Sequence, residues 1–214
     1  MAELIRDASL INEPCNEVDV RKNNKDVRAI VVEMKDVIRE NNLVCLTANQ
    51  IGYNMKIFCI NFNGDIRTFV NPYIANVTNF NLSRETCVSL PGREFIIPRY
   101  DTAVINYQTP LGKIESRKLI GMAAHLAQQC VDMLECIFLD TLGLEVDEQF
   151  DNASEEEQLE VIKAYLDSLE VKQKELEAEI NDSEELTELE TTAKAIQKIS
   201  EGEMVIKPIE KEDI

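Results

Sequence analysis

Two helical patterns enclose a series of short β-rich runs, and this order constrains the fold more than any other feature of the chain. Residues 26–41 repeat apolar side chains at three- and four-residue spacing, which is typical of an amphipathic helix. Residues 120–139 are apolar around much of their circumference and predict a buried helix. The β-rich runs between them lie at residues 56–62, 67–70, 95–98 and 103–108. We therefore expect an α+β domain.

Turn-forming residues separate these β-rich runs. They are Asn63-Gly64, Asn71-Pro72 and the segment at residues 110–112. Short runs joined in this way favour antiparallel strands. We expect these strands to surround the buried helix as the central element of the fold.

The sequence changes character at Ser154. Ser154 and Glu157 have the spacing of a capping box, and apolar residues then follow a heptad-like alternation as far as Ile180. A second, shorter apolar pattern runs from about residue 186 to residue 200. We predict a first domain at residues 1–148 and a helical extension at residues 149–214, folded as a helical hairpin with a coiled-coil-like seam.

Most of the negative charge lies in this extension. The chain has a net charge of −18, and residues 154–214 contain 19 acidic and 7 basic side chains. So acidic a surface excludes nucleic acid as a partner, because phosphate binding requires a cationic face. The apolar seam predicts a protein partner or self-association through the helices at about residues 154–200; the alternative is that it packs on its own domain.

The chain lacks a pattern for insertion into a membrane. Its first residues are charged, and no apolar run approaches the roughly 20 residues that a membrane-spanning helix needs. We expect a cytoplasmic protein without a membrane partner. Its cysteines occur singly, mostly within apolar runs, which favours reduced thiols over a disulfide framework. They are Cys15, Cys45, Cys59, Cys87, Cys130 and Cys136.

Two segments of the first domain resemble the signatures of peptide deformylases. Residues 43–52 read L-V-C-L-T-A-N-Q-I-G, similar to G-x-G-L-A-A-x-Q-x-G, with Leu43 and Cys45 at the first two glycines. Residues 85–91 read E-T-C-V-S-L-P, similar to E-G-C-L-S-x-P. The resemblance extends over about residues 5–142. It implies a peptide-deformylase-like fold and metal-dependent removal of a formyl group from N-terminal methionyl peptides.

The third signature of the family departs from its pattern here. Residues 128–133 read Q-Q-C-V-D-M where the family has Q-H-E-x-D-H, and Gln128 and Asp132 fix the alignment. The resemblance then places Gln129 and Met133 at the two metal-binding histidines. It places Cys130 at the glutamate that acts as general acid and base.

These replacements remove the groups that the family's chemistry needs. A catalytic divalent metal requires about three protein ligands, and an amide and a thioether substitute poorly for two imidazoles. Without the cation, the pKa of the attacking water stays near 16 instead of falling to about 7. Loss of the glutamate removes a further factor of about 10²–10⁴. We therefore predict that the chain holds no metal and no cofactor and is not an enzyme.

Other parts of the family's site are still present. Cys87 stands at the remaining ligand position, and Gln50 and the backbone N–H of Val88 stand where the family polarises the formyl oxygen. We predict a remnant cleft, formed by Val44, Gln50, Cys87, Val88 and His125. A purely structural role is the alternative, with Gln50 bonded to buried backbone and Cys87 as a small apolar filler.

Two further arrangements of the site stay open. Cys87, Cys130 and His125 could form a different metal site, although His125 lies one helical turn from the expected position. Cys87 and Cys130 could instead form a disulfide, which a reducing compartment disfavours.

Three functions are compatible with these residues. The first is a catalytically inactive protein reused as a structural, interaction or assembly component; a bacteriophage particle is one concrete form, since phages carry deformylase-like genes, and would place the chain in the virion. The second is a deformylase or metallohydrolase with residual or altered activity. The third is a module that binds N-terminal peptides without turnover.

Overall fold

The structure is a computed structural model that describes residues 3–180, and the chain divides into two compact units between Gly143 and Leu144. The division predicted from composition lies a few residues further on, at residue 148. In the first unit the helices are η1 (Ala8–Leu10), α1 (Asn24–Asn41), η2 (Ala48–Ile51), α2 (Met122–Leu134) and α3 (Leu139–Leu142). Its strands are β1 (Cys45–Thr47), β2 (Ile57–Phe62), β3 (Asp65–Cys87), β4 (Leu90–Gln108) and β5 (Ile114–Ile120).

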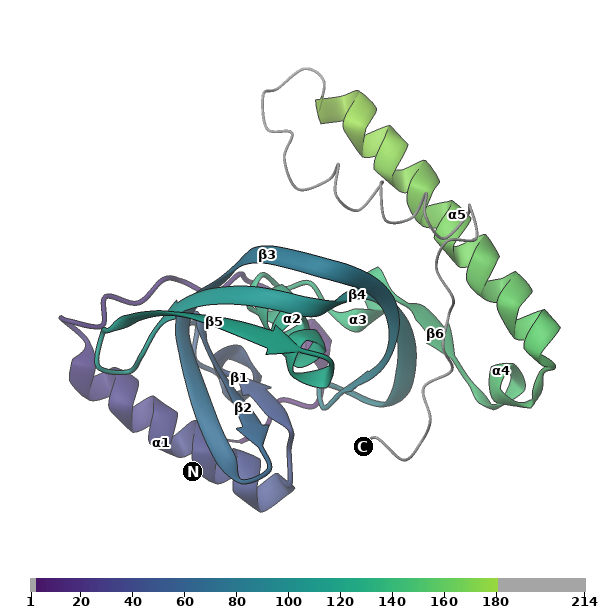
Figure 1. Ribbon diagram of the computed structural model, residues 1–214. Helices are drawn as coiled ribbons and strands as arrows, with labels where there is room; N and C mark the ends of the chain where they lie inside the picture. The colour runs from purple at the N-terminus through teal and green to yellow at the C-terminus, as the bar shows by residue number, and fades with distance from the viewer. Residues whose placement is uncertain (1–2, 181–214) are drawn as a thin grey trace. The chain divides into compact units, whose positions relative to one another are not determined.

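The strands of the first unit form an antiparallel sheet in the order β1-β2-β3-β4-β5. Figure 1 shows β3 and β4 as long ribbons that curve together around α2. The predicted antiparallel strands around a central helix are confirmed.

Strands β3 and β4 are longer than the sequence pattern predicted. The turn expected at Asn71-Pro72 is wrong, because β3 continues through it with a register shift between Val70 and Tyr73. Asn71 takes a φ of 46°, and its side chain bonds both the N–H and the carbonyl of Val18 at 2.8 Å. The asparagine therefore marks a β-bulge held by an adjacent segment.

The sequence pattern missed β5 and overextended α2. Strand β5 alternates exposed and partly covered side chains, and only Leu119 is buried, so its apolar signal is weak. Gly121, at a φ of 59°, separates this strand from α2, and the helix ends at Leu134, before Cys136 at a φ of 60°. The helix is therefore shorter at both ends than the predicted segment at residues 120–139.

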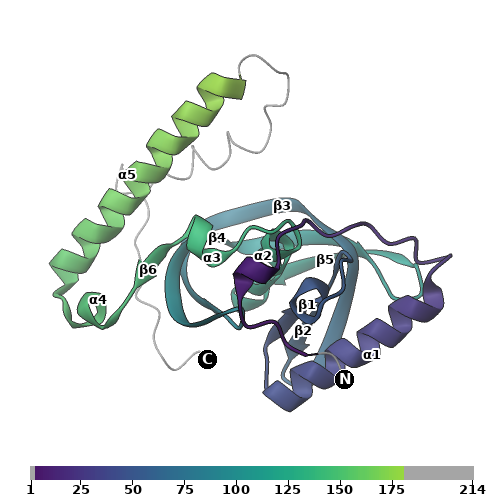
Figure 2. The same cartoon turned by 180° about the vertical axis from the view of Figure 1, so that it is seen from behind.

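The first unit has two apolar clusters. One surrounds α2 and includes Phe58, Phe69, Phe95 and Met133. The other lies between α1 and the strands β1 and β2, where Met34, Ile38 and Leu46 are completely buried. Figure 2 shows α1 alongside β1 and β2, seen from behind. The two clusters fix both faces of the short strand β1, which forms part of the pocket described below.

The second unit contains β6 (Leu144–Val146), α4 (Glu148–Asn152) and α5 (Glu155–Ile180). The predicted capping box is present: Ser154 N–H donates to Glu157 Oε2 at 2.8 Å, and Glu157 N–H to Ser154 Oγ at 3.4 Å. The second helix of the predicted hairpin lies outside the described residues. Association through these helices stays a prediction. Among residues 3–180, no helix is both long enough and apolar enough to cross a membrane.

Candidate functional site

A buried ion network holds α2 against the sheet. Arg99 of β4 pairs with Glu85 of β3 through Nε and Oε1 at 2.9 Å, and with Asp132 of α2. Gln128 adds hydrogen bonds to the backbone of Tyr100, with Nε2 2.8 Å from its carbonyl oxygen and Oε1 3.1 Å from its amide nitrogen. The two residues that fix the frame of the third signature, Gln128 and Asp132, therefore position the helix.

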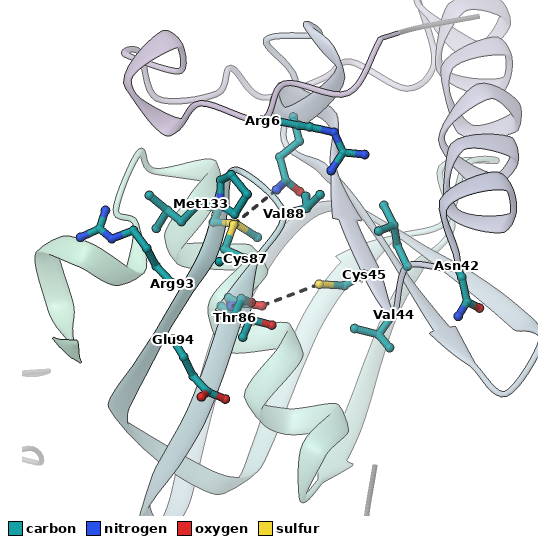
Figure 3. A pocket seen from close by; sticks show the side chains of 16 residues that line it. Arg6, Asn42, Val44, Cys45, Thr86, Cys87, Val88, Arg93, Glu94 and Met133 are labelled. Carbon is teal, nitrogen blue, oxygen red and sulfur yellow. Dashed lines mark hydrogen bonds between the residues drawn. The ribbon is translucent and has the colours of Figure 1, made fainter. Parts of the chain in front are cut away.

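A pocket of about 550 Å³ lies between β1, the turn joining β3 to β4, and α2. Figure 3 shows the side chains that line it. They are Arg6, Asn42, Leu43, Val44, Cys45, Gln50, Thr86, Cys87, Val88, Leu90, Pro91, Gly92, Arg93, Glu94, Gln129 and Met133. Val44, Gln50, Cys87 and Val88 from the predicted cleft thus lie together, joined by Gln129 and Met133.

Gln50 is positioned by the short helix η2. Its Oε1 accepts the Thr47 backbone N–H at 3.0 Å, which completes a capping box, and its Nε2 donates to Ser89 Oγ at 3.1 Å. The same Nε2 lies 3.6 Å from Cys87 Sγ. Gln50 is 1% exposed. Its amide therefore has a structural role, and its Nε2 edge faces the sulfur of Cys87.

Cys87 ends β3, and Val88 and Ser89 form the tight turn before Leu90 begins β4. Burial raises the pKa of the Cys87 thiol to about 11, and hydrogen bonds from the Ser89 backbone only partly offset this effect. The thiol is therefore neutral at pH 7 and is a weak nucleophile and a weak metal ligand.

Gln129 and Met133 lie one turn apart on the face of α2 that lines the pocket. Gln129 Nε2 donates to the Thr86 carbonyl at 3.0 Å, and its Oε1 lies 3.7 Å from Cys45 Sγ. Met133 Sδ lies 3.5 Å from Cys87 Sγ. The three positions that the resemblance assigns to metal ligands are therefore adjacent in space.

Cys130 and His125 do not line the pocket. Cys130 is fully buried among Cys45, Cys59 and Cys87, and burial followed by a hydrogen bond with Cys45 raises its pKa. His125 lies in the first turn of α2, and its Nε2 is 2.8 Å from Oδ1 of Asp101 on β4. The histidine predicted in the cleft is thus engaged by a carboxylate elsewhere. All six cysteines are free, so the alternative Cys87–Cys130 disulfide is not formed.

Ser89 and Arg99 are site residues that sequence reasoning did not single out. Ser89 Oγ donates to the Ile5 carbonyl at 2.7 Å while it accepts from Gln50, and so ties the N-terminal segment to the pocket. Arg99 holds α2 through its ion pairs. Ser89 stands within the second signature, and Arg99 ends the segment that follows it, at residues 95–99, which also resembles the family. Those positions were the only signal available.

The donor atoms do not fit the divalent metal that the resemblance implies. Such a site needs deprotonated thiolate, imidazole or carboxylate ligands. The pocket offers a neutral thiol, a thioether, and an amide whose nitrogen is bonded to backbone. In the described part of the chain, no three His, Cys, Asp or Glu side chains are grouped so that they could hold a metal ion. No catalytic step through a divalent metal is therefore derived for this site.

In comparisons with known proteins, residues 4–144 match the family model "Polypeptide deformylase". The peptide deformylase of Dictyoglomus turgidum is 28% identical over 139 residues, which cover 64% of this chain and 91% of that protein. The crystal structure of peptide deformylase from Thermotoga maritima has a TM-score of 0.62 at 20% identity, covering 67% of this chain and 98% of that one. A Met-Ala-Ser-bound peptide deformylase from Acinetobacter baumannii has a TM-score of 0.59 at 20% identity, and the match covers 65% of this chain and 98% of that one.

These matches contradict one prediction. We expected that the chain is not an enzyme, yet the matched relatives are named for an enzymatic activity and nothing in the matches marks this chain as inactive. Three replaced side chains define which ion a site can hold. They do not remove the pocket or the donors grouped around Cys87, and the prediction gave them too much weight. The predicted assembly role is not tested and stays a prediction.

Proposed function

Because the chain belongs to the polypeptide deformylase family, we propose that it binds peptides by their N-terminal methionyl residue and hydrolyses an N-formyl group through an altered site. The observation that carries the proposal is the grouping of Gln50, Cys87 and Val88 in one pocket. These residues come from η2 and from the turn between β3 and β4, and they stand where the resemblance places recognition of the formyl group.

The pocket suits an apolar side chain with a peptide attached to it. Its volume of about 550 Å³ lies within the range of small-ligand sites. Leu43, Val44 and Met133 give it apolar walls, while Arg6 and Glu94 add charged groups that can meet a peptide backbone. The relatives are named as deformylases of peptides, and one neighbour was solved with Met-Ala-Ser bound.

The chemistry that the chain's own residues support is polarisation of a carbonyl. The backbone N–H of Val88 can donate to an oxygen that becomes negative during attack, and so can the Gln50 Nε2 hydrogen that faces Cys87 Sγ, in exchange for that long contact. Such donors commonly contribute a factor of about 10²–10³. Attack of the Cys87 thiolate on the formyl carbon breaks the C–N bond, forms an S-formyl thioester and releases the peptide amine, which takes its proton from water; a second water then hydrolyses the thioester to formate and regenerates the thiol. Because the Cys87 thiol is neutral at pH 7 and has a pKa raised to about 11, the proposed turnover is slow and rises with pH.

The test is formate release from formyl-Met-Ala-Ser by the full chain, measured between pH 7 and pH 10. We expect a rate above the protein-free reaction that increases with pH and falls in Gln50→Glu, which removes the Nε2 donor. A matched control is Gln149→Glu, which makes the same change on α4, remote in sequence from the pocket lining. A rate equal to the protein-free reaction at every pH would contradict the hydrolytic part of the proposal.

A further inference from the structure

Arg6 places a positive charge at the mouth of the pocket, in a chain whose net charge is −18. The residue belongs to the N-terminal segment that precedes η1, and it is exposed. In Figure 3 its side chain extends from that segment along the upper part of the pocket. Because a guanidinium stays protonated at every physiological pH, the pocket carries a permanent cation at this point.

The other two charged side chains that line the pocket already have ionic partners. Glu94 pairs with Arg84, and Arg93 Nη1 lies 3.2 Å from Asp140 Oδ2. Figure 3 shows Arg6 and Glu94 at opposite ends of the pocket, so this carboxylate does not neutralise the guanidinium. Arg6 itself forms no ion pair with another residue in the described part of the chain. The pocket therefore offers one cation that is available to an anionic ligand.

The backbone next to Arg6 is held in place by the pocket. Ile5 N–H donates to the Gln50 carbonyl at 2.8 Å, and the Ile5 carbonyl accepts from Ser89 Oγ at 2.7 Å. Ala8 N–H donates to the Ser89 carbonyl at 2.9 Å. Gln50 and the turn that contains Ser89 also carry the donors proposed for the formyl oxygen. The Arg6 backbone is therefore fixed relative to the reacting end of the peptide.

We infer that Arg6 selects formylated peptides with an acidic side chain directly after the methionine. An extended peptide advances about 3.3–3.6 Å per residue, so the side chain that follows the methionine lies at the mouth of the pocket, within reach of the guanidinium. A guanidinium can bind a carboxylate through two parallel charge-assisted hydrogen bonds, which a neutral amide of the same shape cannot match. This inference rests on the proposed function, because it requires the formyl group to bind beside Gln50 and Cys87.

The experiment measures calorimetric dissociation constants of the full chain for three peptides with amidated C-termini: formyl-Met-Asp-Ser, formyl-Met-Asn-Ser and formyl-Met-Lys-Ser. The amide removes the terminal carboxylate, so only the second side chain varies in charge. We expect the aspartyl peptide to bind about fivefold more tightly than the asparaginyl peptide at low ionic strength, which is the scale of an exposed ion pair. This ratio should approach one at about 1 M salt, because salt screens exposed charges.

Reversal of the charge at residue 6 gives the sharper result. Arg6→Glu should bind the lysyl peptide more tightly than the aspartyl peptide, and partial unfolding cannot produce this exchange because it would weaken all three peptides alike. Arg21→Glu is the matched control, because Arg21 is also exposed, precedes α1 and does not line the pocket. It should keep the wild-type order of affinities.

The outcomes separate this inference from the proposed function. Equal affinity of the wild type for the aspartyl and asparaginyl peptides, or an unchanged preference in Arg6→Glu, would overturn the role of Arg6 alone. Absence of binding by all three peptides would overturn that role together with the proposed function.

Discussion

Arg99 Nε lies 2.9 Å from Glu85 Oε1 in the interior of the first unit, and both side chains are buried. The same guanidinium pairs with Asp132, so one cation serves two carboxylates from different elements. Burial raises the pKa of Asp132, and Arg99 opposes this by lowering it. The charge of Arg99 therefore keeps the buried Glu85 and the partly buried Asp132 compatible with the fold.

Replacement of Arg99 by methionine should destabilise the chain strongly. The variant leaves two carboxylates without their cation, and breaking a buried ion pair in this way costs about 3–5 kcal/mol. Urea denaturation followed by circular dichroism measures the change. Arg39→Met, which breaks the exposed pair with Asp36 on α1, is the control and should cost about 1 kcal/mol or less. Equal losses in the two variants would contradict the structural role of Arg99.

Alkylation of Cys87 should be slow at neutral pH. A pKa raised from 9.0 to about 11 lowers the thiolate fraction at pH 7 about 100-fold relative to an ordinary thiol. The rate should rise about tenfold per pH unit until the pH approaches 11, because only the thiolate reacts. Iodoacetamide labelling, read at Cys87 by mass spectrometry of digested protein, measures it. A rate that levels off below pH 8 would indicate an activated thiol instead.

Two histidines should restore a divalent metal site. The double variant Gln129→His and Met133→His, one turn apart on α2, adds two imidazoles beside Cys87, giving the three ligands of a catalytic metal site. We expect about one zinc ion per chain by elemental mass spectrometry. The control, Gln128→His with Met133→His, moves one imidazole to a position outside the pocket lining and should bind less. A folded double variant without metal would show that the frame of the third signature is misplaced.

The additional change Cys130→Glu tests the general acid position. Cys130 is completely buried and does not line the pocket, so a glutamate there must displace neighbouring side chains to reach the cavity. We expect the triple variant to bind zinc as the double variant does but to lose stability, because a buried carboxylate without a partner is costly. Thermal denaturation compares the melting temperatures of the double and the triple variant. Equal melting temperatures would indicate that residue 130 reaches solvent more easily than its burial implies.

The fold could be predicted from the sequence where short motifs fixed it. The frame set by Gln128 and Asp132 placed Gln129 and Met133 correctly beside Cys87, because helical spacing is rigid. The extent of β3 could not be predicted, since a bulge at Asn71 resembles a turn in sequence and depends on its hydrogen bonds to Val18. Long-range partners of this kind leave no local pattern.

The site shows the same limit. His125 was expected in the cleft because it lies one turn before Gln129, yet Asp101 of β4 holds it elsewhere. The contact between Cys87 and Met133 joins residues whose separation in sequence carries no periodicity, so only the packed structure reveals it. The pattern of residue types indicated which chemistry was absent. It could not indicate which atoms had come together.

The most direct test of the central claim is calorimetric titration of the full chain with formyl-Met-Ala-Ser and with Met-Ala-Ser. We predict saturable one-to-one binding of the formylated peptide, weakened about tenfold, or ~1.4 kcal/mol, by Val44→Asp at the pocket wall. Val32→Asp, at a similarly exposed valine on α1, should leave the affinity unchanged. Absence of binding heat with both peptides, or equal affinity in the two variants, would contradict the assignment of this pocket to N-terminal peptides.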